Sequence, residues 1–491
     1  MRFADRPVSG DSFAMLIDGE WVAARAGESF ACVNPYTEEG WGCIPRANAG
    51  EVDRAVCAAR RAFEADGWPQ TPPARRAVLL RRLGQLVEEH ADALAHQQVR
   101  ENGKLITEMR PQCDVLASAC HYFAGLAETE CGKWVPAGRP DMVTCTVREP
   151  IGVVAAITPW NSPLLILAWK LLPALAAGNA VVVKPSEVTP TSTLLFAELI
   201  ARAGFPRGVV NVVTGYGDPT GVALVRHPGV DKITFTGSTA TGRAIAHAAA
   251  ERNARVQLEL GGKSPNIVFA DADLSNAVNG IMAGVFAASG QTCVAGSRVL
   301  VEEGIYDRVV KLLVSRARRM RPGDPFDPAT QLCPLASRAQ LDRVLRHFDA
   351  AREDGLELLT GGRRLDRQGF FVEPTVYGNV PNSARLAREE VFGPVAALMR
   401  FTSEDEAVGI ANDTAYGLAA GVWTESVRRA HRMALRLRAG SVWVNNYRLV
   451  SYAIPFGGFK QSGIGRELGP AALDEYTEEK SVWIDVAAAD R

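Results

Sequence analysis

The sequence lacks the features that mark membrane and nucleic-acid-binding proteins. Its 54 Lys and Arg residues almost balance its 55 Asp and Glu residues, and the net charge of −1 gives no reason to expect nucleic acid or an anionic membrane as a partner. The N-terminus carries charges but no apolar segment of the kind that a signal peptide needs. We therefore expect a cytoplasmic protein that does not bind a membrane. The most apolar region falls short of the roughly 20 uninterrupted apolar residues of a membrane helix, because it is broken by Pro159, Asn161, Pro163, Lys170 and Pro173.

Metal-binding and disulfide patterns are also missing. Seven scattered histidines form no HExxH or similar cluster, and we expect no metal site. The nine cysteines are odd in number and no two have the CxxC spacing, which favours reduced thiols buried as small hydrophobic side chains. A cysteine with a chemical role must therefore be recognised by its own surroundings.

The length and the pattern of apolar residues predict an α/β architecture. A chain of 491 residues is too long for one ordinary core, so we expect two or three domains. Helical spacing dominates between residues 51 and 130. From residue 151 wholly apolar runs alternate with helical segments, as in a doubly wound parallel sheet, and a second α/β pattern runs from 261 to about 460. Two lone strands, 142–148 and 480–486, can pair at an edge and form an interface.

Cys293 differs from the other cysteines in its surroundings. It follows the string SGQT, which is typical of a glycine loop after a helix, and it precedes a segment expected to start another helix. A cysteine at a helix N-terminus has its thiolate favoured by the helix dipole, and a thiolate is a strong nucleophile. The alternative is a buried structural thiol.

Glu259 lies at the end of an expected strand, directly before two glycines. The strand places Leu258 and Leu260 on one face and Glu259 on the other. Ligands in open α/β sheets bind at the carboxyl ends of strands, and a carboxylate can activate water. Glu259 is therefore a candidate for chemistry, the alternative being a solvated carboxylate.

The usual nucleotide-binding motifs are absent. The segment FTGSTATG at 235–242 has the spacing GxxxxG, so it does not match the dinucleotide fingerprint GxGxxG. Gly262-Lys263-Ser264 imitates the end of a phosphate-binding P-loop, but Gln257 stands where the first glycine of that motif must be. A P-loop is therefore excluded.

Several strings taken together resemble the signatures of the NAD(P)-dependent aldehyde dehydrogenase superfamily, in the hydrolytic branch that does not acylate coenzyme A. They are ELGGKSPN at 259–266, GQTC at 290–293 and PFGGFKQSGIGRE at 455–467, which matches the family pattern PxGGxKxSGxGRE. The resemblance spans roughly residues 15 to 485.

The resemblance implies the aldehyde dehydrogenase fold, which is α/β, and a homodimer or homotetramer. The implied parts are a Rossmann-like parallel-sheet NAD-binding domain, an α/β catalytic domain and a small β element for bridging and oligomerisation. Their expected boundaries are 1–126 and 150–260, then 261–465, then 127–149 and 466–491.

The resemblance also assigns roles to individual residues. Cys293 is the nucleophile and Glu259 the general base, while the Asn161 amide and the Cys293 backbone N–H stabilise the oxyanion formed on attack. From the sequence alone, Asn161 could instead cap the helix that follows it. The cofactor-binding residues implied in the same way are Thr158, Pro159, Trp160, Lys184, Ser186, Glu187, Gly237, Ser238, Leu260, Gly261, Glu390 and Phe392.

Glu187 bears on the choice of cofactor. In the family, Lys184 and Glu187 reach the hydroxyls of the adenine ribose, and an anionic Glu187 would repel the 2′-phosphate of NADP. NAD is therefore the expected cofactor, and NADP is less favoured. Without the resemblance, 184–187 would be a charged loop and 389–395 an acidic turn.

The substrate tunnel can be placed only by analogy with the family. Its small Ser162 stands where many relatives carry an aromatic residue, which leaves room for a bulky or ring-bearing aldehyde. Arg448 is a lone cation in its loop that could bind a substrate carboxylate. The alternative is a surface arginine that contacts water or a neighbouring subunit. The implied lining is Ser162, Ile166, Trp169, Thr292, Val294, Tyr447, Arg448, Tyr452 and Phe456.

The expected reaction is oxidation of a small-molecule aldehyde to the carboxylic acid with NAD, through a Cys293 thiohemiacetal and a thioester that is hydrolysed by water activated by Glu259. One alternative is a CoA-acylating semialdehyde dehydrogenase, a branch that generally lacks the general-base glutamate. The other is a non-catalytic ligand-binding or structural member of the same fold, against which the intact Cys293, Glu259 and Asn161 argue.

Overall fold

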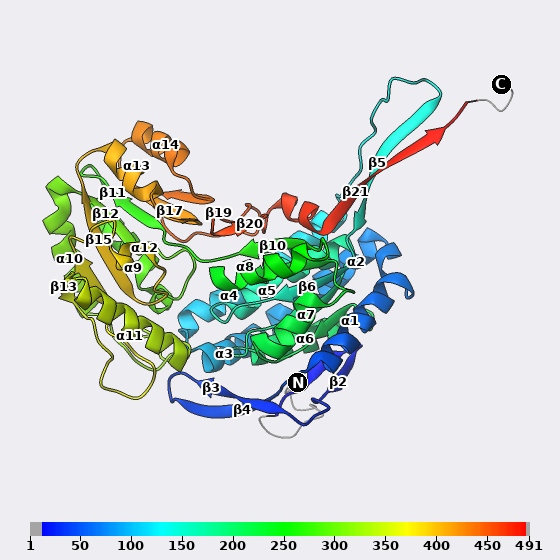
Figure 1. Ribbon diagram of the computed structural model, residues 1–491, viewed down its shortest axis with the longest axis horizontal. Helices are drawn as coiled ribbons and strands as arrows, with labels where there is room; N and C mark the ends of the chain where they lie inside the picture. The colour runs from blue at the N-terminus through cyan, green and yellow to red at the C-terminus, as the bar shows by residue number, and fades with distance from the viewer. Residues whose placement is uncertain (1–11, 488–491) are drawn as a thin grey trace.

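The computed structural model describes residues 12–487. It shows two α/β bodies side by side and an arm that projects from one of them (Figure 1). The ends of the expected domains, at 1–11 and 488–491, lie outside the described residues.

The first body is built on a sheet with eight strands in the described chain, and its central strands are parallel. The chain winds outward from β6 through β7 to β8 and then resumes on the other side of β6 with β9 and β10. Ligands bind at such a switch point in doubly wound sheets. The spatial order is β2 (Glu20–Val22), β1 (Met15–Ile17), β8 (Val210–Val212), β7 (Ala180–Lys184), β6 (Val153–Ile157), β9 (Lys232–Thr236), β10 (Arg255–Glu259) and β20 (Gly463–Ile464).

Helices cover both faces of this sheet, which explains why its central strand β6 is wholly apolar and β7 nearly so. In β6, Val153 and Ala155 pack into one core while Val154 and Ala156 pack into the other. One face carries α1 (Ala49–Glu64), α7 (Val222–Arg226) and α8 (Thr239–Ala250). The other carries α2 (Pro73–Glu89), α3 (Ala91–Asn102), α4 (Ile106–Ala127), α5 (Pro163–Ala177) and α6 (Thr191–Ala203).

The second body contains a sheet with seven strands in the described chain, all parallel except β13. Their order is β13 (Glu357–Thr360), β14 (Thr375–Gly378), β15 (Val395–Phe401), β12 (Arg298–Glu302), β11 (Pro265–Val268), β17 (Ala419–Trp423) and β18 (Ser441–Val444). The helices of this body are α9 (Leu274–Val285), α10 (Tyr306–Arg318), α11 (Arg338–Glu353), α12 (Arg385–Arg388), α13 (Glu404–Asn412) and α14 (Val427–Arg436). Both predicted α/β patterns are confirmed.

The projecting arm is formed by the two strands that the sequence isolates. Strand β5 (Met142–Pro150) pairs antiparallel with β21 (Thr477–Asp485) over its whole length, and Figure 1 shows the pair reaching away from both bodies. The predicted pairing of these distant segments is confirmed. Two further pairs are β3 (Ser29–Asn34) with β4 (Glu39–Pro45), and β16 (Tyr416–Gly417) with β19 (Phe459–Lys460).

One contact inside the second body can be tested by a matched pair of substitutions. Gly280 in α9 lies so close to Trp423 that a Cβ would collide with the indole ring, whereas a Cβ at Gly409 in α13 would meet nothing. We expect Gly280→Ala to destabilise the fold by about 1–3 kcal/mol through overpacking. Gly409→Ala should stabilise it by about 0.4–1 kcal/mol, because alanine restricts the unfolded chain. If the melting temperatures of both variants shift in the same direction, the predicted difference in packing between Gly280 and Gly409 is wrong.

Candidate active site

Cys293 lies in a turn that its flanking residues hold in an unusual conformation. Ala288, Ser289 and Gly290 have φ values of 53°, 50° and 72°, and the left-handed region costs about 1–3 kcal/mol for a residue other than glycine. Neighbouring groups fix the loop, since the Ala288 N–H donates to Glu108 Oε1 over 2.7 Å. The loop thus presents Cys293 in a fixed, half-buried position.

The expected helix after Cys293 is wrong. The residues that follow form a turn, and β12 begins at Arg298, so no helix that starts after Cys293 lends its dipole to the thiol. Burial raises the pKa of the Cys293 thiol to about 12, and the nearby Glu259 and Glu390 carboxylates add to the rise. In this state of the protein the thiol is therefore protonated at neutral pH.

Glu259 is the last residue of β10, as expected, but it is not solvated. The residue is 3% exposed, and in the described chain neither carboxylate oxygen has a hydrogen-bond partner. A Cβ at Gly457 would lie 2.8 Å from its Oε1, so the glycine backbone packs directly on the carboxylate. Burial, followed by the charge of Glu467, raises the pKa of Glu259 well above its usual value. A carboxyl with a raised pKa is suited to take up a proton near neutrality.

A buried ion pair lies within electrostatic range of Glu259. Lys170 of α5 donates to Glu467, and both side chains are fully buried. The Lys170 charge lowers the pKa of Glu259 while Glu467 raises it. The position of this pair therefore helps to set the protonation of Glu259.

Asn161 follows β6 and lies beside the Cys293 turn. Its Nδ2 donates to the Gln291 carbonyl oxygen over 3.1 Å, which leaves a second N–H on the same nitrogen. The alternative that Asn161 caps the next helix is wrong, because α5 begins at Pro163 after Ser162, and no side chain caps it. The Asn161 amide is thus held beside the Cys293 turn by a contact with the backbone.

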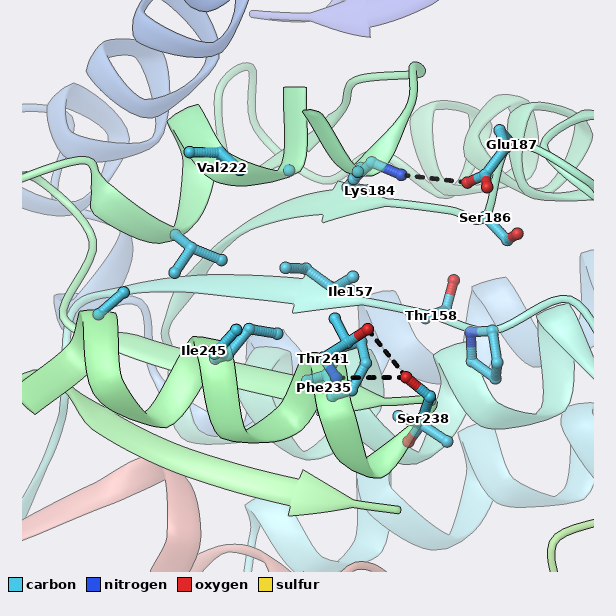
Figure 2. Close-up of a pocket in the computed structure, with 18 of the residues that line it drawn as sticks. Ile157, Thr158, Lys184, Ser186, Glu187, Val222, Phe235, Ser238, Thr241 and Ile245 are labelled. Carbon is cyan, nitrogen blue, oxygen red and sulfur yellow. Dashed lines mark hydrogen bonds and ion pairs between the residues drawn. The ribbon is translucent and has the colours of Figure 1, made fainter. Parts of the chain in front are cut away.

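A large cavity of about 470 Å³ opens beside β6 and the start of α8. Figure 2 shows its apolar wall, which includes Val222 and Ile245, and its polar rim. Ser238 caps α8 by accepting the Thr241 N–H over 3.2 Å, and Lys184 Nζ lies 3.9 Å from Glu187 Oε2. The expected cofactor residues in this wall are Thr158, Pro159, Trp160, Lys184, Ser186, Glu187, Gly237 and Ser238.

A smaller cavity of about 110 Å³ continues from the first, with which it shares Pro159, Trp160, Gly237 and Ser238. Glu390 Oε1 accepts the Gly262 N–H over 3.0 Å, and the Trp160 and Phe392 rings meet edge to face. The remaining expected residues in this wall are Asn161, Ile166, Leu260, Gly261, Cys293, Glu390 and Phe392. The structure therefore brings the expected cofactor residues and Cys293 into one continuous cleft.

Three residues of the smaller cavity are missing from the set expected from the sequence: Thr236 at the end of β9, Gln340 and Arg343. Gln340 and Arg343 lie on α11 and line the cavity opposite the first sheet. Gln340 Nε2 donates to the Phe392 carbonyl oxygen over 2.9 Å, and Arg343 Nη2 donates to the Glu390 carbonyl oxygen over 2.7 Å. The positions of Gln340 and Arg343 on an ordinary amphipathic helix do not indicate a binding role in the sequence. Only the fold places these side chains in the wall of the cavity.

The expected tunnel residues come from α5, the Cys293 turn and the loop before β19. The Trp169 and Phe456 ring centroids are 5.1 Å apart, and the Tyr447 hydroxyl donates to the Val294 carbonyl oxygen over 2.9 Å. Arg448 Nη1 donates to the Ala283 carbonyl oxygen over 3.0 Å, so part of its guanidinium is held by the protein.

Three other expected tunnel residues lie nearby. Ser162 and Thr292 are half-buried beside Asn161 and Cys293 in the chain. Tyr452 contacts Tyr122 of α4, with ring centroids 5.1 Å apart. Within residues 12–487, no group of three or more His, Cys, Asp and Glu residues could hold a metal ion, and no helix is long and apolar enough to cross a membrane.

Known proteins are similar to this chain over almost its whole length. The model of the aldehyde dehydrogenase family matches residues 21–482. The chain is 45% identical to an aldehyde dehydrogenase of Emericella nidulans, covering 95% of this chain and 94% of that one. The NAD+ complex of an aldehyde dehydrogenase from Bacillus cereus has a TM-score of 0.95 at 43% identity, with 97% of both chains covered.

A betaine aldehyde dehydrogenase mutant from Staphylococcus aureus, in complex with NAD+ and with a BME-modified cysteine, also has a TM-score of 0.95. It is 39% identical and covers 97% of this chain and 98% of that one. The expected fold is confirmed by these structures. With a family match over almost the whole sequence and full-length relatives well above 30% identity, the chain belongs to the aldehyde dehydrogenase family.

Proposed function

We propose that this protein uses NAD to oxidise an aldehyde to the carboxylic acid, and that water hydrolyses the thioester intermediate. The observation that carries the proposal is the convergence of three groups. Cys293 and Asn161 line the end of the cleft that also contains the expected cofactor residues, and Glu259 is buried within electrostatic range of the thiol. A nucleophile, an oxyanion donor and a base are the set that acyl transfer to water requires.

The residues of the cleft fit a dinucleotide. The apolar wall with Val222 and Ile245 suits an adenine ring, and the N-terminus of α8 suits a pyrophosphate. A Cβ at Gly261 would lie 2.6 Å from Glu390 Oε2, so the glycine allows this carboxylate to lie directly against the backbone in the wall of the smaller cavity. Bound NAD would supply the acceptor for a hydride at that end of the cleft.

In the first half of the reaction, the Cys293 thiol releases its proton to water, and the thiolate adds to the aldehyde carbon and forms a carbon–sulfur bond. The carbonyl electron pair moves onto oxygen, where the Asn161 amide and the Cys293 backbone N–H hold the charge. When the oxyanion re-forms its double bond, the carbon loses a hydride with two electrons to the cofactor. Cys293 then carries a thioester.

In the second half, Glu259 takes a proton from a water molecule. The resulting hydroxide attacks the thioester carbon, the carbon–sulfur bond breaks, and the thiolate of Cys293 leaves with the bonding electrons. The acid is released, and the proton on Glu259 returns to solvent. Lys170 and Glu467 tune this step, because their charges act on Glu259.

Two further expectations complete the proposal. The two sheets and the arm support the proposed division into an NAD-binding domain, a catalytic domain and an oligomerisation element, with β20 of the expected catalytic segment joining the first sheet. The arm exposes apolar side chains at its far end, with Trp134 70%, Trp483 60% and Ile484 49% exposed. We infer that this surface is covered in a homodimer or homotetramer, since exposed apolar patches mark interfaces.

The function is tested by NADH formation with a panel of aldehydes. Wild type should turn over without coenzyme A, and Cys293→Ala should not. Glu259→Gln should give a burst of NADH close to one per active site, followed by a steady state slower by roughly a hundredfold or more, because a general base contributes on that scale. Cys57→Ala, which removes an exposed cysteine, serves as the control and should behave as wild type.

Three outcomes would contradict parts of this proposal. Dependence on coenzyme A would favour the acylating branch, and no turnover with any aldehyde would favour a non-catalytic member. Equal slowing of burst and steady state in Glu259→Gln would show that Glu259 acts before the thioester forms.

The protonation of Cys293 in the free enzyme gives a second prediction. With a thiol pKa of about 12, the thiolate fraction rises about tenfold per pH unit from pH 7 to pH 10. The rate of alkylation by iodoacetamide, followed on the Cys293 peptide by mass spectrometry, should rise in the same proportion. A rate that levels off below pH 9 would show a low-pKa thiolate instead. Alkylation of the exposed Cys43, measured in the same samples, serves as the control for the activity of the reagent.

Glu187 should set the preference for NAD over NADP. Its carboxylate lines the adenosine end of the cleft and would meet a 2′-phosphate with like charge. We expect higher kcat/KM with NAD, and a ratio that narrows by about tenfold or more in Glu187→Ser, which corresponds to about 1.4 kcal/mol. Glu251→Ser removes an exposed carboxylate at the end of α8 and should leave the ratio unchanged. An unchanged ratio in Glu187→Ser would place the discrimination elsewhere.

A further inference from the structure

Gln291 is a fully buried residue of the Cys293 turn, and its side chain is held at both ends of the amide group. Its side-chain oxygen accepts the Ala336 N–H over 2.8 Å. Its Nε2 donates to the carbonyl oxygens of Ala288 and Pro334 over 3.2 Å and 3.3 Å. Its backbone N–H also donates to the Ala288 carbonyl oxygen, over 3.1 Å. The residue therefore cannot rotate without breaking several buried hydrogen bonds.

The segment 333–336, which holds this side chain, is itself fixed by its surroundings. A Cβ at Gly103, the residue after α3, would lie 2.7 Å from the Cγ of Pro334, so the proline ring rests directly on the glycine backbone. The Leu335 N–H donates to the Phe370 carbonyl oxygen over 2.8 Å. The side chain of Gln291 is thus tied to a segment that packs against the first body.

The backbone carbonyl of Gln291 contacts the proposed oxyanion donor. Asn161 follows β6 of the first sheet, and its Nδ2 donates to the Gln291 carbonyl oxygen over 3.1 Å. An amide group is planar, so this bond to one N–H also sets the direction of the other. Asn161 and Cys293 lie in the wall of the same cavity of about 110 Å³. Gln291 is fully buried, so it can influence a ligand there only through these neighbours.

We propose that Gln291 is a positioning residue, which holds the Asn161 amide in the direction needed to stabilise an oxyanion formed at Cys293. This inference rests on the proposed addition of Cys293 to a carbonyl carbon. Donors that already point at the developing charge are effective because they need no reorganisation during the reaction. The role of Gln291 is therefore specific to addition to a carbonyl, and other reactions of the same thiol do not depend on it.

The proposal is tested with two reagents that modify Cys293 by different routes. With 4-nitrophenyl acetate, the sulfur adds to the ester carbonyl, and the oxyanion then collapses and expels 4-nitrophenolate with the bonding electrons. With iodoacetamide, the sulfur displaces iodide, and no charge develops on a carbonyl oxygen. Both reactions need the same thiolate, so a change in its ionisation affects them equally.

Gln291→Met should slow only the first of these reactions. Release of 4-nitrophenolate, corrected for the rate in Cys293→Ala, should fall by about tenfold or more, since loss of an oxyanion donor costs about 10²–10³. Alkylation of the Cys293 peptide should stay near the wild-type rate. Equal slowing of both reactions would show that Gln291 positions the thiol and would overturn the proposal, as would wild-type rates in both.

A double-mutant cycle tests whether Gln291 acts through Asn161. In the Asn161→Ala background, Gln291→Met should change the release of 4-nitrophenolate by less than about twofold, because the amide that it orients is gone. Losses that multiply in the double variant would show that the two residues act independently, and would overturn the proposal.

Two further variants control for stability. Gln98→Met replaces another buried glutamine, whose Nε2 donates to the Leu94 carbonyl oxygen within α3, and should leave both rates unchanged. Gln291→Asn keeps an amide that is one methylene shorter, and should show the same selective loss. It replaces Gln291→Met if melting curves show that the latter does not fold. Wild-type rates of both reactions in a folded Gln291→Asn would overturn the proposal.

The ester reaction needs no NAD, so this inference and the proposed function can fail separately. Selective loss of ester acylation in Gln291→Met, together with no NADH from any aldehyde in wild type, would support the positioning role and overturn the oxidation. NADH formation in wild type, together with equal slowing of acylation and alkylation in Gln291→Met, would do the reverse. A wild type in which Cys293 releases no 4-nitrophenolate would overturn the positioning role.

Discussion

The active site depends on a close passage of backbones where the first sheet ends and the second begins. Strand β10 ends at Glu259, and the chain then crosses the Cys293 turn at Gly261 and Gly262. A Cβ at Gly262 would collide with the Cys293 carbonyl oxygen. Ser462 locks the crossing, because its backbone oxygen accepts the Leu260 N–H and its hydroxyl donates to the Gly261 carbonyl oxygen. One crossing therefore positions Glu259 and Cys293, the proposed base and the proposed nucleophile, together.

The same crossing buries more charge than an ordinary protein core contains. Glu259 has no hydrogen-bond partner in the described residues, and Lys170 and Glu467 form a fully buried pair. Such groups contribute little to stability, since desolvation offsets their attraction. Their value is chemical, because a low-dielectric environment shifts pKa values strongly and makes the protonation of each group depend on its neighbours. The apolar packing of the two sheets must supply the stability that these groups do not.

Much of the fold and of the site follows from local sequence signals. Wholly apolar runs such as 153–157 indicate strands buried on both faces, and the alternating run 142–148 indicates an edge strand. Glycine-rich strings reveal the site because they mark the places where backbones must approach closely, as at Gly262. Such motifs can be recognised in the sequence because the local backbone conformation that they indicate depends mainly on residues adjacent in the chain.

Other features depend on contacts that no local signal carries. Gln340 and Arg343 lie on a helix far along the chain, and only the fold brings them into the wall of the smaller cavity. The helix expected after Cys293 is wrong because the run 298–302 is rich in β-branched residues and forms β12, so the segment before it is a turn. The consequence is chemical, since burial and nearby carboxylates now act on the thiol without the dipole of a helix that starts after it.

Those electrostatics impose an order on the proposed reaction. A Cys293 thiolate and a Glu259 carboxylate are like charges in a buried site, and each raises the energy of the other, as the raised pKa of the thiol shows. Both groups are therefore disfavoured as anions at the same time. While Cys293 is the nucleophile, a protonated Glu259 is the lower-energy partner. Once sulfur is neutral in the thioester, that repulsion disappears, and Glu259 can ionise and act on water. Cys293 and Glu259 repel each other when both are anions. They are therefore suited to act one after the other, first the Cys293 sulfur and then the Glu259 carboxylate.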